Sequence, residues 1–103
     1  MNFSDRVLIS NLKDHIGEQV TLAGWLYNNR PSGKIQFLIL RDGSGMCQCV
    51  IEKKNINEVL YDEIRHLGQE SSLSVTGTVR AEERSVGGYE LAVSDAEIIS
   101  ESK

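Results

Sequence analysis

The spacing of apolar residues changes twice along this chain of 103 residues, and that change limits the fold more than any other feature. From Val20, apolar and small residues fall at every second position, which is the period of a strand with one buried face. After Asn55 the period is helical, and from Leu73 it is again that of a strand. With the turn-forming residues between these regions, the pattern predicts three strands, one helix and two further strands.

Local signals set the expected bounds of the helical parts. The helix is expected to begin at Asn55, because Glu58 follows three residues later as in a capping box, and to end at Gly68. Near the N-terminus, Ser10 is expected to cap a short turn over residues 11–16, and Gly17 to end it. The apolar stripe expected on the main helix consists of Val59, Leu60, Ile64 and Leu67.

The expected strands are residues 20–27, 34–41, 46–52, 73–81 and 89–99, the last bent near Ser94 and Asp95. This order is that of the OB-fold, a five-stranded Greek-key barrel with a helix between strands 3 and 4, although other small barrels are an alternative. We predict a single OB-fold domain over residues 1–103, with 1–19 as an N-terminal extension and 20–100 as the barrel. Such barrels bind ligands on strands 2 and 3, between loops that would here be residues 28–33 and 82–88.

Composition excludes several classes of protein. One domain's length excludes most multi-part enzymes, and a net charge of −4 argues at first against nucleic acid, whose binding domains are usually basic. The longest apolar run, residues 37–40, is far shorter than the roughly 20 residues that cross a bilayer. Residues 1–5 lack the basic and apolar regions of a signal peptide. We therefore expect a cytoplasmic protein without membrane contact.

The charge is divided unevenly along the sequence. Residues 20–41 carry Arg30, Lys34 and Arg41 and no acidic residue, a local charge of +3, whereas residues 82–103 carry a local charge of −4. The basic segment would form part of the ligand face of the barrel, where a local positive potential attracts phosphates. The alternative is that these cations are ordinary surface charges.

Two side chains on the expected second and third strands are candidate ligand contacts. If Leu38 and Leu40 fill the core, Phe37 is exposed and can stack on a base, although both faces of this strand are apolar and Phe37 could itself be core. Cys47 and Cys49 suit the interior, so Gln48 between them is expected to point outward. Its amide can donate and accept in one plane, as the reading of a base edge requires, but it could also be merely solvated.

Metal and enzyme chemistry find less support. Cys47 and Cys49 could bind zinc, but two ligands fall short of the usual four, so we expect both to be reduced core thiols. His15 is expected at a helix end or on the surface. His66 is expected in the last helical turn, where a cation complements the helix dipole.

The sequence resembles a known family. Residues 24–45 read GWLYNNRPSGKIQFLILRDGSG and are followed by Gln48, a series similar to the N-terminal anticodon-binding domain of class IIb aminoacyl-tRNA synthetases. The spacing SGKIxFL and the phrase YELAVSD at residues 89–95 resemble the asparaginyl branch more than the aspartyl or lysyl branch, and the aspartyl type is the alternative. The resemblance extends over residues 7–102.

This resemblance implies a role for several positions. Phe37 matches the aromatic residue that stacks on an anticodon base, and Gln48 matches the amide that reads the central uridine. Arg30 matches an arginine that approaches the anticodon, and Glu90 an acidic residue that contacts an anticodon base; Lys34 is assigned to the same site. The sequence departs from the family in that the spacing from Arg30 to Phe37 is one residue shorter than in some aspartyl enzymes, and Pro31 follows the arginine.

The resemblance also implies what the barrel leaves to other domains. Family members activate their amino acid with ATP and magnesium in a separate catalytic domain, so we expect this chain to bind the anticodon loop of tRNA without charging it and to need no cofactor. The parent enzyme is expected to be a homodimer and the isolated domain a monomer. Two other functions are a nonspecific single-strand-binding module, which would use several aromatic residues, and a domain whose sheet only packs on a protein partner.

Overall fold

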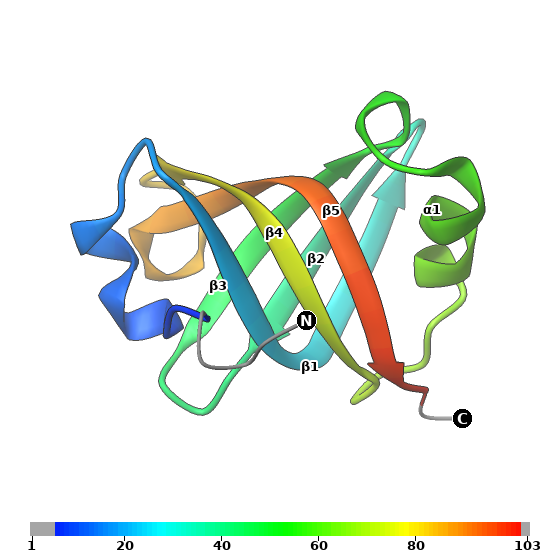
Figure 1. Ribbon diagram of the computed structural model, residues 1–103, viewed down its shortest axis with the longest axis horizontal. Coiled ribbons are helices and arrows are strands. Elements are labelled where there is room, and N and C mark those ends of the chain that lie inside the picture. Colours follow the sequence, from blue (N-terminus) through cyan, green and yellow to red (C-terminus); the bar gives the residue numbers. More distant parts are fainter. Residues whose placement is uncertain (1–5, 102–103) are drawn as a thin grey trace.

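The computed structural model describes residues 6–101, which form a closed five-stranded barrel with the strand order β1-β2-β3-β5-β4 (Figure 1). One α-helix lies between the third and fourth strands, so the predicted OB-fold is confirmed. The strands are β1 (Gln19–Ser32), β2 (Ile35–Arg41), β3 (Met46–Glu52), β4 (Ser72–Ala81) and β5 (Tyr89–Ser100). The helices are α1 (Glu58–Arg65) and the short 3₁₀ helices η2 (Ile9–Asp14), η3 (Lys53–Asn55) and η4 (Val86–Gly88).

A short parallel seam closes the barrel. Strand β3 pairs with β5 at Gln48↔Glu90, Cys49↔Leu91 and Val50↔Ala92, whereas the other neighbouring strands are antiparallel. Strand β5 also changes register against β4 beside Ser94, which confirms the predicted bend. The seam places Gln48 next to Glu90, although the two residues are far apart in the sequence.

The segment expected as a loop at residues 28–33 is instead mostly strand. β1 continues to Ser32 and pairs with β2, with a register shift between Leu26 and Asn28 that marks a bulge. Pro31 is compatible with a strand here because β4 pairs with β1 only as far as Trp25, which leaves one edge of β1 open. The turn itself is confined to residues 33–34, where Gly33 has a φ of +61°.

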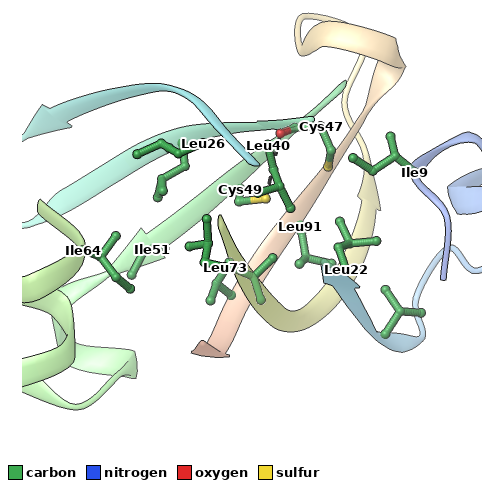
Figure 2. Packing of buried hydrophobic residues seen from close by; sticks show 14 of the residues in the cluster. Ile9, Leu22, Leu26, Leu40, Cys47, Cys49, Ile51, Ile64, Leu73 and Leu91 are labelled. Carbon is green, nitrogen blue, oxygen red and sulfur yellow. Dashed lines mark hydrogen bonds between the residues drawn. The ribbon is translucent and has the colours of Figure 1, made fainter. Parts of the chain in front are cut away.

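The core lies inside the barrel and follows the alternation of the strands (Figure 2). Cys47 and Cys49 of β3 are fully buried, which confirms their predicted core positions, and the burial of Leu38 and Leu40 decides the face of β2 that the sequence leaves open. The alternation therefore puts Phe37 and Gln48 on the outer face of the same two strands.

Two glycines permit the close approach of neighbouring strands. A Cβ atom at Gly24 would lie 2.3 Å from the Arg41 carbonyl oxygen, and one at Gly77 would lie 2.2 Å from that of Ala92. A side chain at either position would therefore force the neighbouring strands apart.

Helix α1 covers one end of the barrel, and its bounds differ from the prediction. The N-cap is Asn57 rather than Asn55, because the Asn57 side chain accepts the Leu60 amide at 3.1 Å. The helix ends at Arg65, before Gly68, and Val59 of the predicted apolar stripe is 67% exposed. The buried stripe instead consists of Tyr61 and Ile64, with Leu60 and Leu67 partly buried.

The N-terminal 3₁₀ helix η2 covers the other end of the barrel (Figure 1). It begins two residues before the predicted turn, and Ser10 does not cap it: the Ser10 amide donates to Ser44 Oγ at 3.1 Å. The Ile9 amide donates to Asp42 Oδ2 at 2.8 Å, which ties η2 to the β2–β3 turn. Gly17 adopts the predicted left-handed conformation, with a φ of +84°.

Within residues 6–101, no helix is long and apolar enough to cross a membrane.

Candidate nucleic-acid interface

The outer face of the barrel aligns side chains from all five strands. The strand pairings place Asn28 opposite Ile39, Ile39 opposite Gln48, Gln48 opposite Glu90, and Glu90 opposite Arg80. The adjacent outer row begins with Arg30 opposite Phe37. Residues that point outward are thus brought together by register alone.

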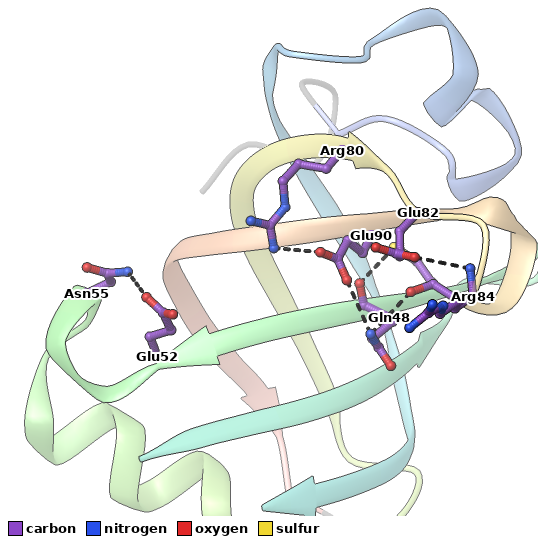
Figure 3. Close-up of polar contacts among 9 residues, drawn as sticks. Gln48, Glu52, Asn55, Arg80, Glu82, Arg84 and Glu90 are labelled. Atoms are coloured by element: carbon purple, nitrogen blue, oxygen red, sulfur yellow. Dashed lines mark hydrogen bonds and ion pairs between the residues drawn. The ribbon is translucent and has the colours of Figure 1, made fainter. Parts of the chain in front are cut away.

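Gln48 is the centre of a polar network on this face (Figure 3). Its Nε2 donates to Ser85 Oγ at 3.2 Å and to Glu90 Oε2 at 3.2 Å. The second carboxylate oxygen of Glu90 pairs with Arg80 at 2.6 Å, and the Glu90 side chain is only 13% exposed. The network fixes the amide of Gln48 at the surface.

A hollow of about 540 Å³ opens beside this network. We call it the β4–β5 hollow; it is lined by Arg30, Gln48, Glu82, Arg84, Ser85 and Glu90. The loop between β4 and β5 supplies one wall and the outer face of the sheet supplies the floor. Three of the predicted site residues, Arg30, Gln48 and Glu90, therefore meet in one place.

Phe37 lies next to the hollow and faces outward, as predicted. The Arg30 guanidinium carbon is 4.6 Å from the centre of the Phe37 ring, a cation–π contact between paired residues of β1 and β2. The guanidinium thus lies over the Phe37 ring, and both groups are of a kind on which a base can stack.

Lys34 is the predicted site residue that the structure places elsewhere. It is exposed on the β1–β2 turn and does not line the β4–β5 hollow. Arg41, the third cation of the basic segment, is paired with Glu70 at 2.7 Å and lies 5.5 Å from the Trp25 ring centre.

The charges at the hollow are mixed, since two arginines and two glutamates line it. The hollow itself is therefore not purely basic. Phosphate contacts position a nucleic acid, whereas hydrogen bonds to base edges specify its sequence. An amide and a carboxylate that line one hollow, with an aromatic ring next to it, suit the second task.

Sequence reasoning missed Arg80, Glu82, Arg84 and Ser85. The segment 82–88 was expected to flank the ligand, but nothing in its composition singles out one residue. Arg80 lies within the expected strand 73–81, but its contact with Glu90 depends on the pairing of β4 with β5, which the sequence does not indicate.

The two cysteines lie beneath this face as free thiols. The hydrogen bond with Cys47, together with burial, raises the pKa of Cys49 well above its ordinary value, so it stays protonated. Zinc binds cysteine as the thiolate. Among residues 6–101, no group of three or more His, Cys, Asp or Glu side chains could hold a metal ion.

These features define a class of protein: an OB barrel whose outer face carries an outward-facing aromatic ring beside hydrogen-bonding side chains. The tRNA anticodon family model, described as an OB-fold nucleic acid binding domain, matches residues 20–99. The chain belongs to this family of anticodon-binding OB-fold domains.

Comparison with individual proteins shows which branch of the family this chain is most similar to. The chain is 45% identical to the asparagine–tRNA ligase of Chloroflexus aurantiacus over 99% of its own length and 23% of the ligase. It is 52% identical to that of Desulforamulus reducens over 90% of its length and 21% of the ligase. The crystal structure of asparaginyl-tRNA synthetase from Pyrococcus horikoshii with asparaginyl-adenylate superposes with a TM-score of 0.88 at 37% identity, covering 95% of this chain and 23% of that one. The chain thus spans about a quarter or less of these relatives, and it matches their N-terminal part.

Proposed function

We propose that this domain binds the anticodon loop of asparagine tRNA in the cytoplasm, as the anticodon-binding part of an asparagine–tRNA ligase. The observation that carries the proposal is the convergence of Gln48, Glu90 and Arg30 on one hollow beside Phe37. The identity to asparagine–tRNA ligases supports the choice of tRNA.

Each residue then has a distinct task. Phe37, with Arg30 beside it, stacks on an anticodon base, and Gln48 forms hydrogen bonds with the edge of the central uridine. Glu90 lines the hollow and accepts from a neighbouring base. Lys34, exposed on the β1–β2 turn, contacts a phosphate of the loop.

The barrel reads tRNA and does not charge it. The activation of asparagine with ATP and magnesium falls to the part of the ligases that this chain does not match.

Titration with an anticodon stem-loop RNA tests this function. Wild type should bind the asparagine stem-loop, and Phe37→Ala should weaken binding by about 1–3 kcal/mol through the loss of stacking. Val59→Ala is a matched control, because Val59 is exposed on α1 away from the hollow. The function is wrong if wild type does not bind, or if Phe37→Ala binds with unchanged affinity and sequence preference.

A nonspecific single-strand-binding function is the second candidate. Trp25 lies on the same outer face as Phe37 and is 43% exposed, so the face carries a second aromatic surface. This function predicts that DNA and RNA oligomers of any sequence bind as tightly as the stem-loop. A clear preference for the asparagine anticodon excludes it.

A further inference from the structure

We propose that Arg80 and Ser85 are positioning residues that turn Gln48 into a hydrogen-bond acceptor, so that it recognises uridine by N3–H and rejects cytidine. This inference rests on the proposed function and adds two residues and a direction of hydrogen bonding to it. Neither residue needs to touch the RNA.

The orientation of the Gln48 amide follows from the carboxylate beside it. An ionised carboxylate only accepts hydrogen bonds, so the group of Gln48 that lies 3.2 Å from Glu90 Oε2 has to be its NH₂. Ser85 Oγ accepts a second hydrogen bond from the same NH₂ group, at 3.2 Å. Both donors of Gln48 are thus engaged within the protein.

The free group of Gln48 is its carbonyl oxygen. In the described part of the chain, Oε1 has no hydrogen-bond partner, and it points away from Glu90 (Figure 3). Uracil carries a donor at N3, whereas cytosine carries an acceptor there. An acceptor fixed at this position pairs with the first base and faces the lone pair of the second.

Arg80 holds the carboxylate in place. Its guanidinium forms an ion pair with Glu90 Oε1 at 2.6 Å, and this leaves Glu90 Oε2 to accept from Gln48. The Arg80–Glu90 ion pair joins β4 to β5. The Glu90 side chain is largely shielded from water, which strengthens a charge-assisted hydrogen bond. Without Arg80, the carboxylate is free to turn and the amide loses the group that dictates its orientation.

Modified RNA tests the direction of the hydrogen bond on the unaltered protein. Stem-loops carry uridine, cytidine, 3-methyluridine or 4-thiouridine at the central position. We expect uridine to bind at least about tenfold more tightly than cytidine and 3-methyluridine, and 4-thiouridine to bind within about threefold of uridine, because Gln48 does not donate to O4. Equal losses for 3-methyluridine and 4-thiouridine would overturn the inference.

Substitution of Arg80 tests its positioning role. Arg80→Met should reduce the ratio of uridine to cytidine affinity to about threefold or less, and Arg80→Lys should restore most of it. Arg84→Met is the matched control: Arg84 lines the same hollow outside the Arg80–Glu90 pair, so its loss should weaken both RNAs alike and leave the ratio unchanged. A wild-type ratio in Arg80→Met overturns the role of Arg80.

A second measurement uses only the wild-type protein, so it does not require any variant to fold. In wild type, the side-chain NH₂ of Gln48 should exchange its hydrogens about tenfold more slowly than that of the exposed Gln19, as observed by NMR. Equal exchange rates contradict the network. Failure of wild type to bind any stem-loop would contradict the proposed function and this inference together, whereas discrimination that survives in Arg80→Met contradicts this inference alone.

Discussion

Gln36 and Gln48 lie on neighbouring strands and have the same side chain, but they belong to different regions of the barrel. Gln36 points inward, is fully buried, donates to the Tyr61 carbonyl at 2.8 Å and accepts from Asn29 at 3.0 Å. Gln48 points outward, and its NH₂ is bound while its oxygen is not. The inner amide has donor and acceptor engaged and tethers helix α1, whereas the outer amide keeps one group for a ligand. The unpaired atom, rather than the residue type, distinguishes a binding residue from a structural one.

Substitution of Gln36 should produce the largest effect. Gln36→Ala leaves a cavity and removes one acceptor from the Asn29 amide and one donor from the Tyr61 carbonyl, so we expect a loss of about 2–4 kcal/mol in the free energy of unfolding, measured with urea. Discrimination between uridine and cytidine should be unchanged in the folded fraction. If Gln36→Ala were stable but discriminated differently between uridine and cytidine, Gln36 would be a binding residue and the contrast with Gln48 would be wrong.

Substitution of Gln48 should have the opposite profile. Gln48→Ala should reduce stability by about 1 kcal/mol or less, because its partners Ser85 and Glu90 lie at the edge of a hollow that water can enter. It should remove about 1–3 kcal/mol of discrimination at the central base, measured with uridine and cytidine stem-loops. If stability falls as far as in Gln36→Ala, Gln48 is a structural residue.

The N-cap of helix α1 offers a second test of a purely structural side chain. Asn57→Ala should cost about 1 kcal/mol of unfolding free energy, because the Leu60 amide loses its acceptor. Asn55→Ala is the matched control, since the exposed Asn55 side chain donates to Glu52 and not to the helix backbone, and it should have almost no effect. Equal losses in both variants would show that Asn57 is not the energetically relevant cap.

The smallest effect is expected at Asp42, which holds helix η2. Burial alone would raise the pKa of Asp42, but hydrogen bonds from the Ser44 side chain and from the amides of Ile9, Ser44 and Gly45 outweigh it and lower the pKa below 3.8. Its stabilising contribution is therefore complete above pH 3.8 and is lost as the pH falls through the lowered pKa.

The Asp42→Asn variant isolates this contribution. Between about pH 6 and about pH 3, wild type should lose slightly more stability in urea than Asp42→Asn, which has no carboxylate to protonate. Identical pH dependence in the two proteins would show that the clamp on η2 contributes nothing.

Alternation was enough to predict much of the site. Cys47 and Cys49 indicate which face of β3 is buried, and this places Gln48 outside; the same parity places Phe37 outside once Leu38 is in the core. Sequence alone could not predict the partners of Gln48, because Glu90 and Ser85 reach it through pairings between distant strands.

The misplaced elements have local causes. Asn, Pro and Gly in residues 28–33 are typical of a loop, yet pairing with β2 keeps most of the segment extended. Two asparagines near the start of α1 are equally good caps by type, and only the geometry selects Asn57.

The parallel seam between β3 and β5 has a consequence for the order of events during folding. It joins residues about forty positions apart, and contacts of such long range form late because a large loop has to close first. The hairpin of β2 and β3 can present Phe37 early, but the β4–β5 hollow exists only after the chain has been made beyond Glu90 and the barrel has closed. Recognition of RNA at this hollow is therefore coupled to completion of the fold, and a bound loop should retard unfolding at this seam.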